Sequence, residues 1–324
     1  MWSLKSDYSR KRELMTQPIL RIGTRGSPLA LAQAYETRDR LMAAHDMSED
    51  RFEIVVIKTT GDKIQDRPLG EIGGKGLFTK EIEDALLDGS IDIAVHSMKD
   101  MPVEQPKGLV LDCFLPREDV RDAFVSLKYK SIADLPKGAK LGSSSLRRRA
   151  QILNRRPDIE VVEFRGNVQT RLRKLKEGIA DATFLAMAGL NRLDNSAVAQ
   201  SAIETDDLLP AVAQGAIGIE RREGNQAMHD MLGAIADKDT EMRLTAERSF
   251  LKALDGSCQT PIAGLATLNG DSLTLRGQIL RLDGSDQVSG TISGPTILGT
   301  ELGQKLATSL LEKSAGISFK PHYH

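Results

Sequence analysis

A cysteine on a short turn is the first residue of this sequence with a clear chemical use. Cys258 lies in the segment Leu-Asp-Gly-Ser-Cys-Gln-Thr-Pro, residues 254–261, between an amphipathic helical pattern and a strand-like apolar run. Gly256 is typical of a helix end, and Pro261 cannot continue a helix. Most cysteines are buried as small hydrophobic residues. A turn of Gly, Ser and Gln instead predicts an exposed thiol.

A carboxylate beside a lysine follows one of the predicted strands. Lys99 and Asp100 come directly after the apolar run Ile91 to Val95, and reacting groups commonly lie at the carboxyl ends of such strands. Asp100 could stabilise a cationic intermediate and transfer protons. A purely structural salt bridge with Lys99 is an equally good interpretation. His96, in the same segment, could act as a base or simply pack.

Arginines gather at three turns that each lead from a strand into a helix: residues 24–27, 143–145 and 165–167. Helix N-termini present free N–H groups that bind anions. The arginines at or near these turns are Arg25; Arg147, Arg148 and Arg149; and Arg165, Arg171 and Arg173. Residues 147–176 hold ten basic and three acidic side chains. This local positive charge predicts an anion site.

Two other interpretations of these basic residues remain. Solvated helix faces account for Arg155, Arg156, Lys174 and Lys176. They account less well for arginines at a helix start, because a cation there opposes the helix dipole unless an anion joins it. Nucleic acid is a second possible ligand, but with 4% aromatic residues the chain has few side chains on which bases could stack. Arginine forks favour a small ligand with several carboxylates or phosphates.

The whole-chain composition narrows the possible functions. Lys+Arg 44 against Asp+Glu 45 gives a net charge of −1, which favours neither nucleic acid nor an anionic membrane as a partner. No apolar run approaches the roughly 18 residues of a membrane span. Two cysteines cannot build a disulfide framework and are typical of a reducing cytoplasm. We therefore expect a cytoplasmic protein, and we expect it to be a monomer.

The sequence lacks the usual motifs for binding metals and nucleotides. The histidines and cysteines show no metal-ligand spacing, and His322 and His324 stand alone at the end of the sequence. No Gly-Lys-Ser/Thr phosphate loop and no Gly-x-Ser-x-Gly elbow is present. Cys113 lies in the apolar run 109–115, where we expect it to be part of the core.

Alternating strands and helices must position these residues. Apolar strands at 19–23, 52–58, 91–95, 109–115, 140–142, 159–164, 181–186 and 214–220 alternate with amphipathic helices, and Ser27 and Ser145 are typical helix N-caps. The polar, glycine-rich stretch 59–78 predicts a lid more than a structural connector. After residue 262, strands with polar and apolar alternation predict an antiparallel meander closed by a helix at 298–311.

These patterns predict an α/β protein with two similar mixed-sheet lobes, of the type found in periplasmic binding proteins, and a smaller α+β C-terminal domain with an antiparallel sheet. We expect a flexible leader at residues 1–17. The first lobe is expected to comprise 18–115 and 216–237, the second, arginine-rich lobe 116–215, and the third domain, which carries Cys258, 238–324.

Seven motifs, taken together and in this order, resemble the porphobilinogen deaminase family, whose enzymes are also called hydroxymethylbilane synthases. They are RIGTRGSPLALAQA (21–34), GGKGLFTKEIE (73–83), HSMKDMP (96–102), GSSSLRRR (142–149), FRGNVQTRLR (164–173), QGAIGIE (214–220) and GSCQTP (256–261). The resemblance covers nearly everything after residue 18.

The resemblance implies a cofactor and a reaction. Cys258 would carry a dipyrromethane cofactor through a thioether, and four porphobilinogen molecules would be deaminated and joined head to tail on it. Ammonia and the linear tetrapyrrole hydroxymethylbilane, an intermediate of haem biosynthesis, would be released. Asp100 would be the catalytic carboxylate, which contacts pyrrole N–H groups and stabilises the azafulvenium cation left by ammonia.

The same resemblance assigns the remaining site residues. Cofactor carboxylates would be held by Lys99, Ser145, Arg147 and Arg148, with Asp100 beside the pyrroles. Incoming substrate and the growing chain would be held by Arg25, Ser27, Lys75, Arg165, Arg171 and Arg192, with Lys75 on the predicted lid. Each pyrrole carries two carboxylates, so a six-ring chain has roughly a dozen negative charges. This agrees with an arginine-rich site in a nearly neutral protein.

The sequence departs from the family pattern at two places. Ser257 precedes the cysteine where the family commonly has glycine, and Met101 stands where it commonly has valine. Neither change removes a reacting atom. Two rival functions compete with this one: a non-catalytic, two-lobed anion-binding protein, and a transferase that uses the Cys258 thiol as a nucleophile in every turnover.

Overall fold

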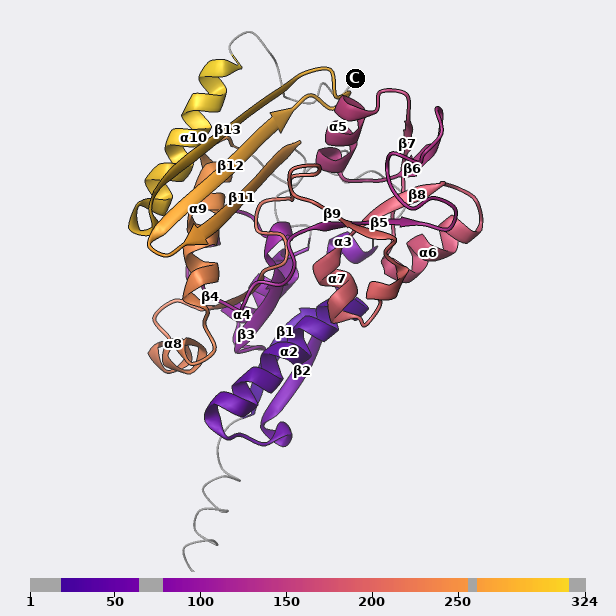
Figure 1. The fold of residues 1–324 in the computed structure, drawn as a ribbon. Coiled ribbons are helices and arrows are strands. Elements are labelled where there is room, and N and C mark those ends of the chain that lie inside the picture. The colour runs from indigo at the N-terminus through magenta and orange to yellow at the C-terminus, as the bar shows by residue number, and fades with distance from the viewer. Residues whose placement is uncertain (1–18, 64–77, 256–260, 315–324) are drawn as a thin grey trace, which may run out of the picture.

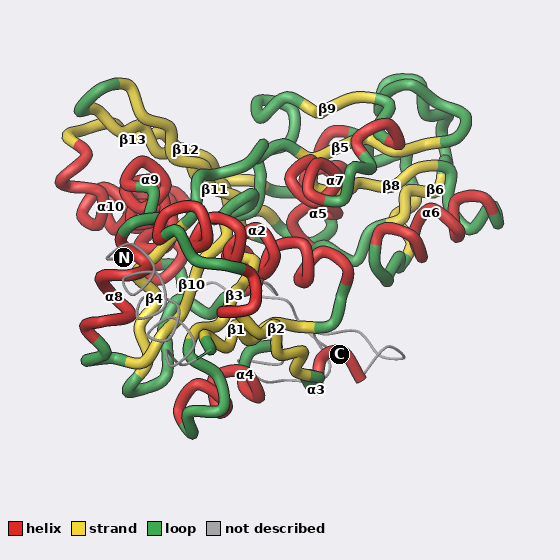
Figure 2. The backbone as a smooth tube through the Cα atoms, turned by 90° about the horizontal axis from the view of Figure 1, so that it is seen from below, coloured by secondary structure: helices red, strands yellow, loops and turns green. Residues whose placement is uncertain are grey.

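The strands of the protein form three separate sheets (Figures 1 and 2). The computed structural model describes residues 19–63, 78–255 and 261–314. Two sheets have five strands each and mixed direction, and the third has three antiparallel strands. The predicted fold class, two mixed-sheet lobes and a C-terminal domain with an antiparallel sheet, is confirmed.

The first lobe is built on the sheet β2-β1-β3-β10-β4. The first three strands are parallel, and β10 runs antiparallel to both of its neighbours. The strands are β1 (Leu20–Arg25), β2 (Phe52–Ile57), β3 (Ile93–Ser97), β4 (Leu109–Phe114) and β10 (Ile217–Arg222), and the helices are α2 (Pro28–His45), α3 (Thr60–Lys63), α4 (Lys80–Leu87) and α8 (Gln226–Gly233).

Helices cover both faces of this first sheet. Ala34 and Leu41 of α2 pack with Leu232 of α8 against one face, while Ile82 and Leu86 of α4 pack against the other. The start of α2 agrees with its prediction, because the Ser27 hydroxyl accepts the Ala30 N–H at 3.3 Å and Pro28 is the first helical residue.

The second lobe repeats the same plan in the sheet β7-β6-β8-β5-β9. Its first three strands are parallel and β5 is antiparallel to β8 and β9. Helix α5 packs on one face through Ile152, and α6 and α7 pack on the other. The elements are β5 (Asp122–Ser126), β6 (Lys140–Gly142), α5 (Leu146–Arg155), β7 (Glu160–Val162), α6 (Val168–Lys176), β8 (Ala182–Ala186), α7 (Met187–Arg192) and β9 (Ser201–Ile203).

The C-terminal domain packs two helices on one face of its sheet. Helix α9 (Lys238–Ala253) and helix α10 (Gly299–Lys313) share a core with the meander β11 (Ile262–Asn269), β12 (Ser272–Leu280) and β13 (Gln287–Pro295). Phe250 of α9 and Leu306 of α10 are both fully or nearly fully buried in this core. The predicted meander and closing helix are confirmed.

The prediction missed two strands. No strand is predicted between residues 115 and 140, whereas β5 begins at Asp122. The short strand β9 was not predicted either. The predicted leader, most of the predicted lid, Lys75 and Cys258 lie outside the described residues.

The chain passes between the two mixed-sheet lobes twice, and the two passages lie side by side. The Leu115 N–H donates to the Ile217 carbonyl at 3.1 Å, and the Glu118 N–H donates to the Gly215 carbonyl at 3.2 Å. Gly215 has a φ of +88°, and a Cβ there would lie 2.5 Å from the Glu118 carbonyl oxygen. Glycine is therefore required at this contact.

A buried ion pair fastens the C-terminal domain to both passages. The Glu247 carboxylate of α9 accepts from Arg117 at 2.6 and 3.0 Å, from the Ala213 N–H at 2.7 Å and from the Ala266 N–H at 2.8 Å. The exposed fractions of the Arg117 and Glu247 side chains are 2% and 0%. One carboxylate thus joins the first passage, the second passage and β11.

We expect Arg117→Ala to lower the free energy of unfolding by about 3–5 kcal/mol, because it leaves the Glu247 charge buried without its partner. The matched control is Arg155→Ala, which removes an exposed pair with Asp207 at 3.0 Å and should cost about 0–1 kcal/mol. Urea unfolding followed by circular dichroism measures both. Equal losses in the two variants would contradict the role given to Glu247.

Candidate active site

Three predicted site residues meet at a cavity at the carboxyl end of β3. Arg25 ends β1, Ser27 caps α2, and Asp100 lies on the single turn Met98–Asp100 that follows β3. All three line this cavity, together with Phe78, and the Arg25 guanidinium lies 4.2 Å from the centre of the Phe78 ring. Asp100 is exposed. The carboxylate therefore faces an accessible space beside a helix N-terminus.

A second group of predicted residues surrounds the buried carboxylate of Asp122. Arg147 donates to it at 2.8 Å, Arg148 at 2.6 Å and Gln214 at 2.9 Å. Burial alone would raise the pKa of Asp122, but the two arginines outweigh burial and hold this pKa well below its usual range. Asp122 is therefore ionised at neutral pH and fixes both guanidinium groups.

Each of the two arginines has a further partner and a buried Nε atom. Arg147 also donates to the Leu209 carbonyl at 2.9 Å, and Arg148 to the Phe184 carbonyl at 2.8 Å. Among the described residues, neither Nε atom has a hydrogen-bond partner. A buried donor without a partner is unfavourable. Each arginine thus keeps a buried Nε donor whose hydrogen bond is not made within the described residues.

Lys99 connects the two groups electrostatically. Burial lowers the pKa of its ammonium, and Asp100 acts in the opposite direction. The charges of Arg147 and Arg148, from the other lobe, lower the pKa of Lys99 further, while Asp122 raises it. Lys99, Arg147 and Arg148 carry three positive charges against two on Asp100 and Asp122, which leaves a positive surplus between the lobes.

Ser145, Arg165 and Arg171 lie at the starts of α5 and α6. The Ser145 hydroxyl accepts the Arg148 N–H at 3.4 Å, as an N-cap does. Arg165 pairs with Glu163 at 3.1 Å, and Arg171 donates to the Gly166 carbonyl at 2.9 Å. Burial, with a contribution from the positive charge of Arg148, lowers the pKa of Arg171 to about 10. Arg171 thus extends the positive region around Arg148.

Arg192, the last residue of α7, belongs to neither the Asp100 cavity nor the group around Asp122. Its guanidinium pairs with Glu36 of α2 at 3.0 Å and donates to the Gly215 carbonyl at 3.2 Å. Arg149 and Arg173, which share helices with predicted site residues, are exposed. The structure thus places Arg25, Ser27 and Asp100 at the cavity, and Lys99, Arg147, Arg148 and Arg171 around or near Asp122.

Sequence reasoning missed three polar residues beside these groups. Asp122 and Gln214 are described above. Gln33, buried on α2, accepts a hydrogen bond from the Ser97 hydroxyl at 2.9 Å and lines the Asp100 cavity. A glutamine on the apolar face of a helix was a signal for Gln33. His96 is buried, its Nε2 lies 3.1 Å from Oε2 of Glu220, and it also lines the Asp100 cavity.

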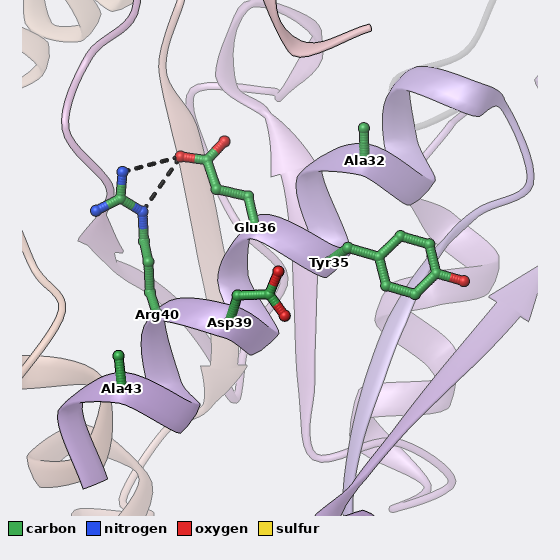
Figure 3. Close-up of a pocket in the computed structure, with 6 residues that line it drawn as sticks. All are labelled: Ala32, Tyr35, Glu36, Asp39, Arg40 and Ala43. Carbon is green, nitrogen blue, oxygen red and sulfur yellow. Dashed lines mark hydrogen bonds and ion pairs between the residues drawn. The ribbon is translucent and has the colours of Figure 1, made fainter. Parts of the chain in front are cut away.

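Elsewhere, the described residues offer little that competes with this site. A shallow hollow on α2 is lined by Tyr35, Glu36, Asp39 and Arg40 and contains no predicted site residue (Figure 3). Within the described ranges no group of three or more His, Cys, Asp or Glu side chains could hold a metal ion. In the same ranges no helix is long and apolar enough to cross a membrane.

Comparison with known proteins identifies the family. The model of the porphobilinogen deaminase dipyromethane cofactor binding domain matches residues 20–230. The chain belongs to the porphobilinogen deaminase family. The model of the family's C-terminal domain matches residues 241–312, so the two matches together cover both mixed-sheet lobes and the third domain.

Two proteins named porphobilinogen deaminase are similar to this chain over most of its length. Porphobilinogen deaminase of Paracoccus denitrificans is 66% identical over 291 residues, which cover 90% of this chain and 93% of that protein. The chloroplastic enzyme of Oryza sativa is 57% identical over 86% of this chain and 78% of its own length. Among solved structures, the periplasmic VFT2 domain of BvgS from Bordetella pertussis has a TM-score of 0.41 at 14% identity, covering 75% of this chain and 97% of that one.

Membership of the family establishes the reaction. The chain is a deaminating transferase of tetrapyrrole biosynthesis with hydroxymethylbilane synthase activity, its substrate is porphobilinogen, and its cofactor is dipyrromethane. The rival interpretation as a non-catalytic anion-binding protein is not favoured.

The structure predicts that Cys113 is chemically inert. It is 2% exposed on β4, its thiol lies 3.5 Å from the Leu232 carbonyl oxygen, and burial raises its pKa to about 12. Since the thiolate is the reactive form, we expect Ellman's reagent to leave a native Cys258→Ser variant unlabelled and to label it fully after denaturation. Rapid labelling of the native variant would show that the first lobe opens at β4.

Proposed function

We propose that Asp100 is the catalytic carboxylate of this chain and that Cys258 carries the dipyrromethane cofactor through a thioether. The observation that supports this most directly is the arrangement around Asp100. An exposed carboxylate at a strand end faces a cavity lined by Arg25 and Ser27. Beside it lies a positive surplus made by Lys99, Arg147 and Arg148.

The residues present fit a ligand with several carboxylates. We propose that Lys99, Ser145, Arg147 and Arg148 hold the carboxylates of the cofactor. The Nε atoms of both arginines are donors without described partners, and Ser145 begins a helix whose N-terminal N–H groups favour anions. When bound, dipyrromethane supplies the primer on which the first porphobilinogen is added.

Asp100 has two tasks in this proposal. Its negative charge stabilises the cation that forms on porphobilinogen as ammonia leaves. Its carboxylate also accepts and returns the proton that is exchanged when two pyrroles are joined. The cavity position suits both tasks, since Asp100 is accessible and yet lies beside groups that bind the substrate's carboxylates.

We assign the binding of incoming substrate and growing chain to Arg25, Ser27, Lys75, Arg165, Arg171 and Arg192. Arg25 and Ser27 line the Asp100 cavity, and Arg171 is close enough to Arg148 for its pKa to be lowered by that charge. Arginine forks bind carboxylates through two parallel hydrogen bonds. Lys75, outside the described residues, is assigned here through its motif alone.

We also propose that the protein is a cytoplasmic monomer without nucleic-acid or membrane partners, and that its domains have the following boundaries. The first lobe would comprise 18–115 and 216–237, the second 116–215 and the third domain 238–324. The two passages between the lobes, which pair near Glu118 and Gly215, support boundaries at these places. The net charge of −1 supports the absence of polyanionic partners.

Intact mass spectrometry tests the attachment site. We expect the purified protein to be heavier than its sequence by two linked pyrrole units, and Cys258→Ser to have the mass of the bare chain. The added mass should persist through many turnovers, because the cofactor is retained. An adduct that is lost in each cycle would support the thiol-nucleophile transferase, and an unmodified active protein would refute the thioether.

Asp100→Asn should keep the cofactor but lower kcat by about 10²–10³-fold, because an amide has the shape of a carboxylate without its negative charge. Turnover of porphobilinogen and intact mass measure the two quantities. The matched control is Glu104→Gln. Glu104 lies four residues after Asp100, its carboxylate is exposed and pairs with Lys252, and its replacement should leave kcat unchanged. Near-normal turnover of Asp100→Asn would refute the role of Asp100.

A further inference from the structure

Arg192 is held between the two lobes by two contacts. It ends α7 in the second lobe, and its Nε donates to Glu36 Oε2 of α2 in the first lobe at 3.0 Å. Its Nη2 donates to the carbonyl of Gly215, in the second passage between the lobes, at 3.2 Å. The side chain is only 9% exposed. Its place is therefore set by the first lobe and the passage as well as by its own helix.

Glu36 divides its two oxygens between two arginines. Oε2 accepts from Arg192, while Oε1 accepts from Nε and Nη2 of Arg40, one turn along α2, at 3.2 and 3.1 Å (Figure 3). Two guanidinium groups and one carboxylate leave a net charge of +1. Glu36 therefore holds Arg192 without cancelling the positive charge that a substrate carboxylate would need.

Arg192 also keeps donors in reserve. A guanidinium has five N–H groups, and the two contacts of Arg192 use Nε and one hydrogen of Nη2. Among the described residues, Nη1 and the second hydrogen of Nη2 have no hydrogen-bond partner. A long side chain that is already fixed loses less freedom when it binds. Its two contacts therefore lower the entropy cost that Arg192 would pay on binding a carboxylate.

We propose that Glu36 is a positioning residue for substrate binding: it holds Arg192 in place across the two lobes so that this arginine can receive a carboxylate of porphobilinogen or of the growing chain. This inference rests on the proposed role of Arg192. Helix α2 ties the two places together. Its N-cap is Ser27, it lines the Asp100 cavity through Gln33, and it reaches Arg192 through Glu36 one turn later.

Glu36→Gln tests the proposal, with Asp39→Asn as its matched control. Both replacements are isosteric and remove one negative charge from α2, but Asp39 is 61% exposed and pairs with Arg38, not with Arg192. We expect Glu36→Gln to raise KM for porphobilinogen about fivefold or more, with kcat per cofactor-loaded enzyme within about twofold of the wild type. Asp39→Asn should change neither parameter.

Arg192→Ala completes a double-mutant cycle. Glu36→Gln should have no further effect on KM when Arg192 is already alanine, because the two residues act through one contact. The positioning role is refuted if Arg192→Ala raises KM while Glu36→Gln leaves KM unchanged, even if Glu36→Gln lowers the melting temperature. The proposed role of Arg192 would then stand. Equal effects of Glu36→Gln and Asp39→Asn would also refute the positioning role. An unchanged KM in Arg192→Ala would refute both.

Discussion

The candidate site depends on one buried carboxylate. Asp122 receives hydrogen bonds from Arg147 and Arg148 of α5 and from Gln214 of the second passage between the lobes. Two guanidinium groups without this charge between them would repel each other in a buried place, and burial of such groups is costly unless they are paired. Asp122 thus allows two neighbouring arginines to remain charged and fixed, and it ties their position to the connection between the lobes.

The positive groups near Asp122 are only partly paired with negative ones, and this suits the binding of an anion. Burial lowers the pKa of Lys99 and of Arg147, so the protein holds these cations at a cost. The Nε donors of Arg147 and Arg148, which have no hydrogen-bond partner within the described part of the chain, add to that cost. Under the proposed function, carboxylates of a bound cofactor or growing chain would offset both costs, in agreement with the concentration of positive charge at one place in a chain of net charge −1. The unfavourable free energy of these buried cations in the free protein would then add to the affinity for an anionic ligand.

Local signals in the sequence predicted much of the fold and part of the site. Ser27 and Ser145 begin helices because hydroxyl N-caps act within a single turn, and Asp100 follows a strand that its own apolar residues define. Contacts between distant residues left no such signal. The partners of Asp122 lie 25, 26 and 92 residues away, and Glu36 lies 156 residues from Arg192. Strand β5 was missed for the same reason, since it begins with a charged residue whose counter-ions come later in the chain.

The strand order of the two lobes has a consequence for how the protein is made. In the first lobe β10 lies between β3 and β4, so β4 joins that sheet only when residues 217–222 are available. All strands of the second lobe lie within residues 122–203. During synthesis from the N-terminus, the inserted second lobe can therefore complete its sheet before β10 of the first lobe has been made. The sheet that supports Asp122 can thus be complete before the sheet that supports Asp100, although Gln214 reaches Asp122 only later.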